Sequence, residues 1–458
     1  WLMTQENKMG VMPVGRLLIS MSVPMMISML VQALYNVVDS VFVSRINENA
    51  LTAVSLAFPI QNLMIAIAVG TGVGVNALLS KSLGEKNQKA ANDAAENGLF
   101  LALLSAAVFL VFGLACSRVF FASQTSDAQI VQYGRDYMWV ICVCGFGMFF
   151  QVMLDRLLIS TGKTLYTMFT QGVGAIINIV LDPLFIFGIG PFPRLEVMGA
   201  AVATVIGQIA AMFLSLYFNL AKNHEIRLRL REFRPHAATI GRIYAVGVPS
   251  ILMSSIGSVM TLAMNNILMV FSSTATAVFG VYFKLQSFVF MPVFGLNNGM
   301  VPIISYNYGA QRRSRVTQTI KYATIYAVAI MLVGLAIFQL APDLLLGFFN
   351  PSEDMLRIGR VALRIISLSF LLAGFSIVCS SVFQALGHGV LSLLVSVGRQ
   401  LVVLVPVAWL LSLTGRLELV WWSFPIAEIM SAALCVVFLR RVNREVLAKL
   451  EEPASAEA

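Results

Sequence analysis

Long apolar stretches and short polar connections alternate along almost the whole chain. Many of the apolar stretches approach or exceed 20 residues, the length that an α-helix needs to cross a hydrocarbon core about 30 Å thick. Barrel strands would instead alternate apolar and polar residues within segments of about ten. The pattern therefore predicts an all-α integral membrane protein with twelve transmembrane helices. We expect these spans near residues 17–44, 50–79, 92–116, 132–154, 165–190, 197–221, 242–271, 275–305, 317–341, 360–383, 391–413 and 418–439.

The composition supports a membrane protein. Of the 458 residues, 58% are hydrophobic and only 12% are charged, and the mean hydropathy is +0.84. A soluble domain would carry about 25% charged residues. The five cysteines show neither CxxC spacing nor a nearby histidine cluster, so we interpret them as packing residues.

The net charge of +9 is unevenly distributed along the chain. Most Lys and Arg residues lie at the termini and in the connections that follow even-numbered spans. They include Lys81, Lys86, Lys89, Arg227, Arg229, Arg231, Arg234, Arg312, Arg313 and Arg315. The positive-inside rule then places both termini on the cytoplasmic side of the cell's inner (plasma) membrane. The basic excess is mainly a topological signal, and we expect no nucleic-acid partner.

The most polar internal connection, KNHEIRLRLREFRPHAATIGR, divides six spans from six and suggests an internal repeat. An ungapped shift of 225 residues (249 − 24) brings similar residues into register. It pairs Val23-Pro24 with Val248-Pro249, Phe58 with Phe283, Gln61 with Gln286, Gly70 with Gly295, Gly74 with Gly299, Ser80 with Ser305, Gly84 with Gly309 and Gly162 with Gly387. Two six-helix bundles related by an axis along the membrane normal are typical of transporters with a site near the midplane.

The repeat defines the expected domain organisation. We predict an N-terminal six-helix lobe at 1–221, a cytoplasmic linker at 222–241, a C-terminal six-helix lobe at 242–440 and a cytoplasmic tail at 441–458.

A polar stripe interrupts the first apolar span. Gln32, Tyr35, Asn36 and Asp39 are spaced i, i+3, i+4 and i+7, so they share one helical face. A carboxylate facing lipid would cost about 2.5–3.5 kcal/mol even on the gentler scales. We therefore expect this face to point into the protein.

The fifth span, GAIINIVLDPLFIFG, carries a second buried acid. Asn178 and Asp182 are stacked one turn apart, and Pro183 leaves the carbonyl of Ile179 without its helical donor. Carboxylate, amide and carbonyl oxygens suit a proton or a hard cation such as Na⁺. If Asp39 approaches Asp182, their repulsion favours binding of such an ion, with Asp39, Asn178 and Asp182 as the Na⁺ ligands. The alternative is that Tyr, Asn or backbone donors simply satisfy both acids.

The second half does not copy this pair. Asp39 corresponds to Met264, and Asp182 corresponds to Val407, so we expect the ion chemistry to be concentrated in the first half. The second half instead carries Lys284, Arg399 and Glu428 within its spans. A Lys–Glu or Arg–Glu pair across helices is one interpretation, and direct substrate contact is the other. The candidates for substrate binding or gating are Gln32, Asn36, Gln61, Lys284, Arg399 and Glu428.

Several segments together resemble the multidrug and toxic compound extrusion (MATE) family, on its bacterial DinF-like branch. They are VPMMISMLVQALYNVVDSVFVSR, INIVLDPLFIFG, MGAAVATVIGQ and FKLQSFVFMPVFGLNNGMVPIISYNYGAQ. The resemblance extends from about residue 13 to 440 and implies a two-lobed antiporter that exports organic cations in exchange for H⁺ or Na⁺. It also implies that Asp39, Asn178 and Asp182 bind the coupling ion, with Thr204 as a further oxygen. Some family members carry acids in the seventh and tenth helices, but these spans have none here.

These observations predict a secondary active multidrug efflux antiporter that works by alternating access, and not an enzyme. We expect no cofactor apart from H⁺ or Na⁺ as coupling ion, small organic cations and the lipid bilayer as partners, and a monomer. Tyr35 completes the predicted coupling site. The alternative is a lipid-linked precursor flippase, whose basic cavity Lys284 and Arg399 would suit. A membrane enzyme is disfavoured because the histidines are scattered, and a channel because no filter-like segment repeats.

Overall fold

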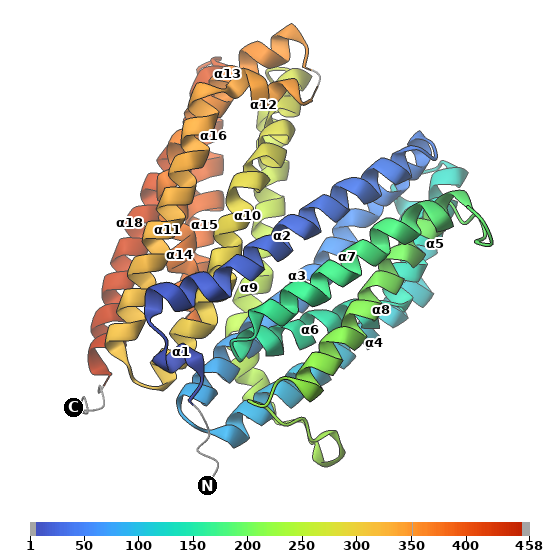
Figure 1. The fold of residues 1–458 in the computed structure, drawn as a ribbon. Coiled ribbons are helices and arrows are strands. Elements are labelled where there is room, and N and C mark those ends of the chain that lie inside the picture. Colours follow the sequence, from blue (N-terminus) through green and yellow to red (C-terminus); the bar gives the residue numbers. More distant parts are fainter. Residues whose placement is uncertain (1–5, 350, 451–458) are drawn as a thin grey trace. The chain divides into compact units, whose positions relative to one another are not determined.

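A computed structural model describes residues 6–349 and 351–450 of the protein, and the described residues form helices without any β-strand (Figure 1). The first half contains α1 (Lys8–Val11), α2 (Val14–Ser44), α3 (Glu48–Gly84), α4 (Gln88–Gln124), α5 (Ala128–Val143), α6 (Phe146–Ser160), α7 (Thr164–Phe187), α8 (Val197–Ala221) and the 3₁₀ turn η1 (Leu230–Glu232). The second half contains α9 (Ala237–Met269), α10 (Ser273–Gly309), α11 (Arg313–Leu340), α12 (Pro342–Gly347), α13 (Glu353–Ile366), η2 (Ser367–Ser369), α14 (Phe370–Ala385), α15 (Gly389–Val397), the π-helical η3 (Gly398–Leu404), α16 (Val405–Ser412), α17 (Leu417–Val420), α18 (Ser423–Glu445) and η4 (Leu447–Lys449).

The described helices confirm the predicted membrane-spanning architecture. Eleven helical segments are long and apolar enough to cross a membrane, and the pair α5 and α6 forms a twelfth that bends by 45°. The bend lies at Cys144 and Gly145, which separate the two helices. In the predicted tail, α18 continues to Glu445 and η4 to Lys449, while residues 451–458 lie outside the described part of the chain.

Helix boundaries repeat at the interval found in the sequence. The first and last residues of α3 lie 225 positions before those of α10 (273 − 48 and 309 − 84). The ends of α2 and α9 keep the same interval (269 − 44), as do those of α6 and α14 (385 − 160). The corresponding long helices of the two halves therefore share many of their ends.

The same repeat extends to single hydrogen bonds. Ser80 Oγ donates to the carbonyl of Ser160 at 2.7 Å, and Ser305 Oγ donates to the carbonyl of Ala385 at 2.7 Å. Each bond ties a long helix (α3 or α10) to the end of another helix of the same half. These buried hydroxyls satisfy carbonyls at helix C-termini, which lack helical donors.

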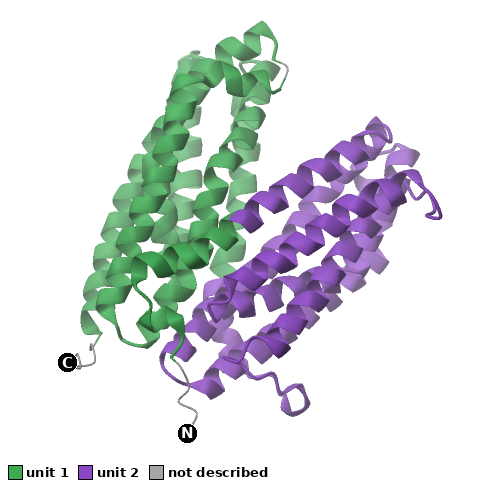
Figure 2. Ribbon diagram, viewed as in Figure 1, with its two compact units in different colours: residues 1–26, 248–458 green, residues 27–247 purple. Residues whose placement is uncertain are grey.

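The boundaries of the two compact units differ from those of the predicted lobes. One unit comprises residues 1–26 and 248–458, and the other comprises residues 27–247 (Figure 2). The predicted lobes were 1–221 and 242–440, so the structure groups the first 26 residues with the second half. The chain passes from one unit to the other within α2 and within α9, two residues after Pro24 and one residue before Pro249.

Close helix packing explains why residues 1–26 belong to the same unit as residues 248–458. Gly299 lies against the start of α2, where an added Cβ would come 2.8 Å from Ser22 Cα. Gly295 lies against the next turn, with the corresponding distance to Met26 Cα being 2.7 Å. Only glycine permits such an approach, so the beginning of α2 packs on α10 rather than on its own half.

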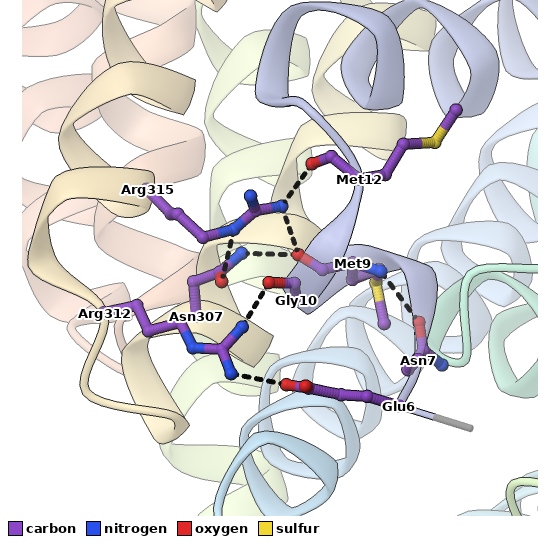
Figure 3. Close-up of polar contacts among 8 residues, drawn as sticks. All are labelled: Glu6, Asn7, Met9, Gly10, Met12, Asn307, Arg312 and Arg315. Atoms are coloured by element: carbon purple, nitrogen blue, oxygen red, sulfur yellow. Dashed lines mark hydrogen bonds and ion pairs between the residues drawn. The ribbon is translucent and has the colours of Figure 1, made fainter. Parts of the chain in front are cut away.

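The N-terminal segment is held on the same unit by a cluster of polar contacts. Figure 3 shows Glu6, Asn7, Met9, Gly10, Met12, Asn307, Arg312 and Arg315. The carbonyl of Met9 accepts from Asn307 Nδ2 at 2.9 Å and from Arg315 Nη2 at 3.0 Å, and the carbonyl of Met12 accepts from Arg315 Nη2 at 2.6 Å. We call residues 6–13 the N-terminal strap. Carbonyls of the strap thus accept hydrogen bonds from side chains of α10 and α11.

The predicted linker at 222–241 is bound in the other unit in a comparable way. Glu96 Oε1 of α4 accepts from the backbone N–H of Arg229 at 2.7 Å, and Asn97 Oδ1 accepts from that of His236 at 3.1 Å. Side chains of α4 therefore fix the segment that leads into α9.

Candidate functional site

The polar residues of α7 lie deep in the unit of residues 27–247. Asn178 is 3% exposed and Asp182 is fully buried, and the two stack one turn apart, as their spacing predicts. Thr204 of α8 is also buried and its Oγ1 donates to the carbonyl of Ala200 at 3.0 Å. Pro183 lies inside α7, so the helix carries a carbonyl without its usual donor beside this acid.

The Asn178 amide can serve Asp182 in two ways. With its nitrogen toward the acid, it donates to both carboxylate oxygens, at 3.1 and 3.2 Å. With the amide reversed, the nitrogen donates to Thr204 Oγ1 at 3.3 Å and the amide oxygen faces Asp182. The first orientation stabilises an ionised carboxylate, whereas the second needs a proton or a cation between the facing oxygens.

Asp39 of α2 lies beside this pair. Its carboxyl group comes within hydrogen-bonding reach of that of Asp182, and its Oδ1 is buried without a hydrogen-bond partner among the described residues. Tyr35, one turn earlier on α2, is close enough to interact electrostatically with both acids. The structure therefore brings together the five residues predicted for the coupling site: Tyr35, Asp39, Asn178, Asp182 and Thr204.

Tyr137 of α5 lies with these five residues, and we call the six together the cluster. Sequence reasoning missed Tyr137. It is 2% exposed, interacts electrostatically with Asp39, Tyr35 and Asp182, and donates from Oη to Gln61 Oε1 at 3.1 Å. A single tyrosine in an apolar segment offers no spacing pattern, so only the fold identifies it. The same hydrogen bond connects Gln61, a predicted substrate or gating residue, to the coupling site.

The electrostatics of the cluster favour a bound cation. Two carboxyl groups lie together, and within the described part of the chain neither forms an ion pair with Lys, Arg or His. The described residues also contain no group of three or more His, Cys, Asp or Glu that could hold a metal ion. Na⁺ would therefore need the amide and hydroxyl oxygens of Asn178 and Thr204 in addition to the two acids, and such hard oxygen ligands fit Na⁺.

The outer members of the predicted stripe on α2 differ from Tyr35 and Asp39. Gln32 and Asn36 are exposed on the surface of their unit and form no hydrogen bond with the cluster. Their positions are compatible with contact to a substrate, and that role stays a prediction.

The second half holds different charged residues, as its sequence predicts. Arg399 Nη1 lies 3.3 Å from Glu428 Oε1, which makes an Arg–Glu pair between η3 and α18. Lys284 is exposed and places its Nζ 5.8 Å from the ring centroid of Phe349. Met264, which corresponds to Asp39, is fully buried. Inside the spans, the described part of the first half thus has paired acids, and that of the second half has an Arg–Glu pair.

Comparisons with known proteins agree with the fold. A model of the MatE family matches residues 24–184 and 249–410. The FAD transporter of Shewanella oneidensis is 26% identical over 440 residues, covering 95% of this chain and 96% of that protein. The multidrug export protein MepA of Staphylococcus haemolyticus is 26% identical over 417 residues, covering 91% of each.

Solved structures show the same architecture. An outward-facing multidrug resistance MATE family transporter of the MOP superfamily superimposes with a TM-score of 0.90 at 26% identity, covering 97% of this chain and 99% of that one. A MOP superfamily transporter from Pyrococcus furiosus, described as having a binding pocket of reverse polarity, gives a TM-score of 0.89 at 26% identity and covers 98% and 99%.

Proposed function

The chain belongs to the MatE family of membrane transporters, and we propose that it exports small organic cations in exchange for H⁺ or Na⁺. It is a multi-pass transporter rather than an enzyme, and multidrug export proteins are among its relatives. Export would proceed by alternating access, with the coupling ion and the substrate each favouring a different state of the protein.

The observation that carries this proposal is the contact between Asp39 and Asp182 without a basic partner among the described residues. Two carboxylates at hydrogen-bonding distance repel each other, and the hydrocarbon surroundings of a membrane protein increase this repulsion. A proton or a Na⁺ ion removes it. Binding and release of the ion would therefore change the relative free energies of states in which the two acids are close or apart.

Asn178 would respond to the ion. When the site is empty, its amide nitrogen donates to Asp182, and when the site is occupied, its oxygen faces the ion while its nitrogen donates to Thr204. A half-turn of one amide thus matches both states, and in each state the amide nitrogen has an acceptor. Tyr35 and Tyr137 would exclude water and orient Asp39.

We also propose an orientation and an assembly for the transporter. The concentration of Lys and Arg in even-numbered connections supports cytoplasmic termini in the plasma membrane. The chain carries both halves of the repeat, so a monomer would be sufficient for transport.

A second candidate substrate is an anionic flavin nucleotide. The similarity to an FAD transporter over 95% of this chain favours it, as does Lys284, which is exposed and forms no ion pair within the described part of the chain. A lipid-linked precursor flippase is the alternative function, and it would use the same basic residues.

Transport by the purified protein in liposomes would separate these functions. Vesicles loaded with ethidium, or with FAD in a parallel set, are given an imposed pH gradient or an imposed Na⁺ gradient, and efflux is followed by fluorescence. Ethidium efflux under one of the gradients would support the antiporter and name its coupling ion. FAD efflux without ethidium efflux would support the second candidate, and efflux of neither would favour the flippase.

A further inference from the structure

The ion pair of Arg399 and Glu428 is incomplete. One contact joins the two side chains, from Nη1 to Oε1 at 3.3 Å. Glu428 is 8% exposed, and its second oxygen, Oε2, is buried without a hydrogen-bond partner within the described residues. An ionisable residue inside a membrane span is costly and usually has a function, and half of this carboxylate is available to another donor.

The backbone at Arg399 is unusual as well. Residues Gly398–Leu404 form a π-helix between α15 and α16, and Arg399 and Gln400 lie at its start. Short π-helical segments occur often at functional sites, because the wider turn displaces side chains that a regular helix would bury. The corresponding residues of the first half, 173–179, lie in the regular helix α7.

The repeat shows what the ion pair replaces. Arg399 corresponds to Gly174 and Glu428 to Ala203 (399 − 225 and 428 − 225). Gly174 packs tightly on α8, where an added Cβ would come 3.1 Å from the carbonyl oxygen of Gly207. The second half thus has a partly buried charge pair where the first half has close helix packing. Packing alone would favour small residues in both halves.

Two further oxygens lie without partners in this region. Gln400 Oε1 and Gln286 Oε1 are both buried and accept no hydrogen bond from the described residues. Gln400 follows Arg399 directly on η3, and its Oε1 lies 3.9 Å from the position of a Cβ added to Gly257 of α9. The side chain of Gln400 is therefore directed from η3 toward α9.

Gln286 lies at the level of Glu428. The rings of Tyr282 (α10) and Phe424 (α18) are in contact, with centroids 6.1 Å apart. Gln286 follows Tyr282 by four residues, and Glu428 follows Phe424 by four residues. The helices α10 and α18 are the eighth and twelfth spans, so both cross the membrane in the same direction. Gln286 and Glu428, one turn beyond the ring contact, therefore lie on the same sides of α10 and α18 as the two rings. Tyr282 also interacts electrostatically with Glu428 and Arg399.

We propose that Arg399, Gln400, Glu428 and Gln286 form a second substrate site, which binds an ammonium group through its N–H donors. The three unpartnered atoms are all acceptors: Glu428 Oε2, Gln286 Oε1 and Gln400 Oε1. Arg399 contacts only Oε1 of Glu428, and the ligand's ammonium takes the oxygens that Arg399 does not reach. An anion would meet one guanidinium but would be repelled by the carboxylate and find no donor at the amide oxygens.

This inference rests on the proposed export of organic cations and narrows the substrate class. A protonated primary amine offers three donors to the site, whereas a quaternary ammonium of the same charge offers none. The site would therefore favour protonated amines over quaternary cations, although both could be transported.

The test is a binding measurement without any ion gradient. The purified full-length protein in detergent is titrated with dansylcadaverine, a fluorescent primary amine, and with its trimethylammonium analogue. Wild type should bind the primary amine about tenfold or more tightly, the usual effect of a hydrogen bond to a charged group. Glu428→Gln should abolish this preference, and Ser431→Ala, three residues later on α18, should keep it. If wild type binds both probes equally, or if Glu428→Gln retains the preference, the proposal is wrong.

Two more variants separate this proposal from folding defects and from the coupling mechanism. Gln286→Leu removes one acceptor and no charge, so it should lower the preference for the primary amine several-fold. This variant tests the site even if Glu428→Gln does not yield folded protein. An unchanged preference in Gln286→Leu would contradict the proposed site. Asp39→Asn should keep the preference for the primary amine. Loss of the preference in Asp39→Asn together with its retention in Gln286→Leu would place amine recognition at the coupling site instead.

Discussion

Asn178 lies one helical turn before Asp182, and its amide nitrogen can donate to both oxygens of that carboxylate, at 3.1 and 3.2 Å. The reversed amide donates to Thr204 Oγ1 at 3.3 Å instead. One side chain can therefore stabilise Asp182 both with and without a bound ion. This arrangement makes the role of the amide testable, because Leu has a similar size but neither a donor nor an acceptor.

Asn178→Leu should weaken coupling while leaving the fold intact. The ionised Asp182 would lose both amide contacts and the bound ion would lose an oxygen ligand, so the two states are destabilised to different extents. Loss of a hydrogen bond to a charged group costs about 1.5–3 kcal/mol, which corresponds to an ion concentration for half-maximal efflux shifted about tenfold or more. Efflux measured against the concentration of the coupling ion checks this. An unchanged half-maximal concentration would mean that the amide does not contact the ion.

The hydroxyl of Thr204 can be tested with a matched pair of substitutions. Thr204→Val keeps the shape but removes the oxygen that faces Asn178, whereas Thr204→Ser keeps the oxygen. We expect the valine variant to need more coupling ion for half-maximal efflux, by about three- to tenfold, as for one neutral hydrogen bond. The serine variant should resemble wild type. Equal behaviour of the two variants would exclude a role for the oxygen.

Tyr137→Phe removes the hydroxyl that donates to Gln61 at 3.1 Å. The ring stays in place, so the effect should be limited to the loss of one neutral hydrogen bond, about 0.5–1.5 kcal/mol. Gradient-driven efflux should slow by a few-fold. Tyr133→Phe on the same helix is the control, because Tyr133 bonds to Glu196 and not to this site. A control variant that is slowed just as much would point to a general effect on α5.

The close contact between α10 and α2 predicts a clear difference between two glycines of one helix. Gly299→Ala would place its Cβ 2.8 Å from Ser22 Cα, whereas Gly280→Ala meets nothing within 4 Å. The first substitution should lower the free energy of unfolding by about 1–3 kcal/mol. The second should not lower it. Thermal unfolding in detergent compares the two, and equal stability would mean that the contact at Gly299 does not exist.

The N-terminal strap depends on Arg315, which donates to the carbonyls of Met9 and Met12. Arg315→Ala removes these two carbonyl contacts and should loosen residues 6–13, so that trypsin cleaves after Lys8 faster than in wild type. Arg313→Ala removes an equal charge two residues earlier from a side chain that takes no part in these contacts, and cleavage should stay slow. Equal cleavage in the two variants would show that the strap is held by other contacts.

The architecture could largely be predicted from the sequence. Apolar segments of membrane-spanning length give the twelve spans, and the 225-residue register gives the repeat, down to the bonds of Ser80 and Ser305. The approach of Asp39 to Asp182 depends on helix packing, but the sequence does show which helix faces carry the two acids. Spacing patterns are sufficient here because the side chains of one helix face are fixed by the helix itself.

Other features depend on tertiary packing, which periodicity does not encode. The grouping of residues 1–26 with residues 248–458 depends on Gly295 and Gly299 of α10, far away in sequence. Tyr137 reaches the acids only because α5 packs beside them. The π-helix at Arg399 and the pairing of Arg399 with Glu428 also depend on tertiary packing. The sequence alone does not show which acid would pair with a single arginine in an apolar span.

The most direct test of the proposed mechanism is efflux of a fluorescent organic cation from liposomes that contain wild type, Asp39→Asn or Asp182→Asn. The ion gradient that drives efflux by wild type is imposed on all three proteins. In parallel, exchange of the organic cation down its own concentration gradient is measured without an ion gradient. Both variants should lose gradient-driven efflux while retaining downhill exchange, because the neutral amide removes the exchangeable ion but not the pathway. Gradient-driven efflux at the wild-type rate in Asp39→Asn would contradict the mechanism and leave the buried acids with a structural role.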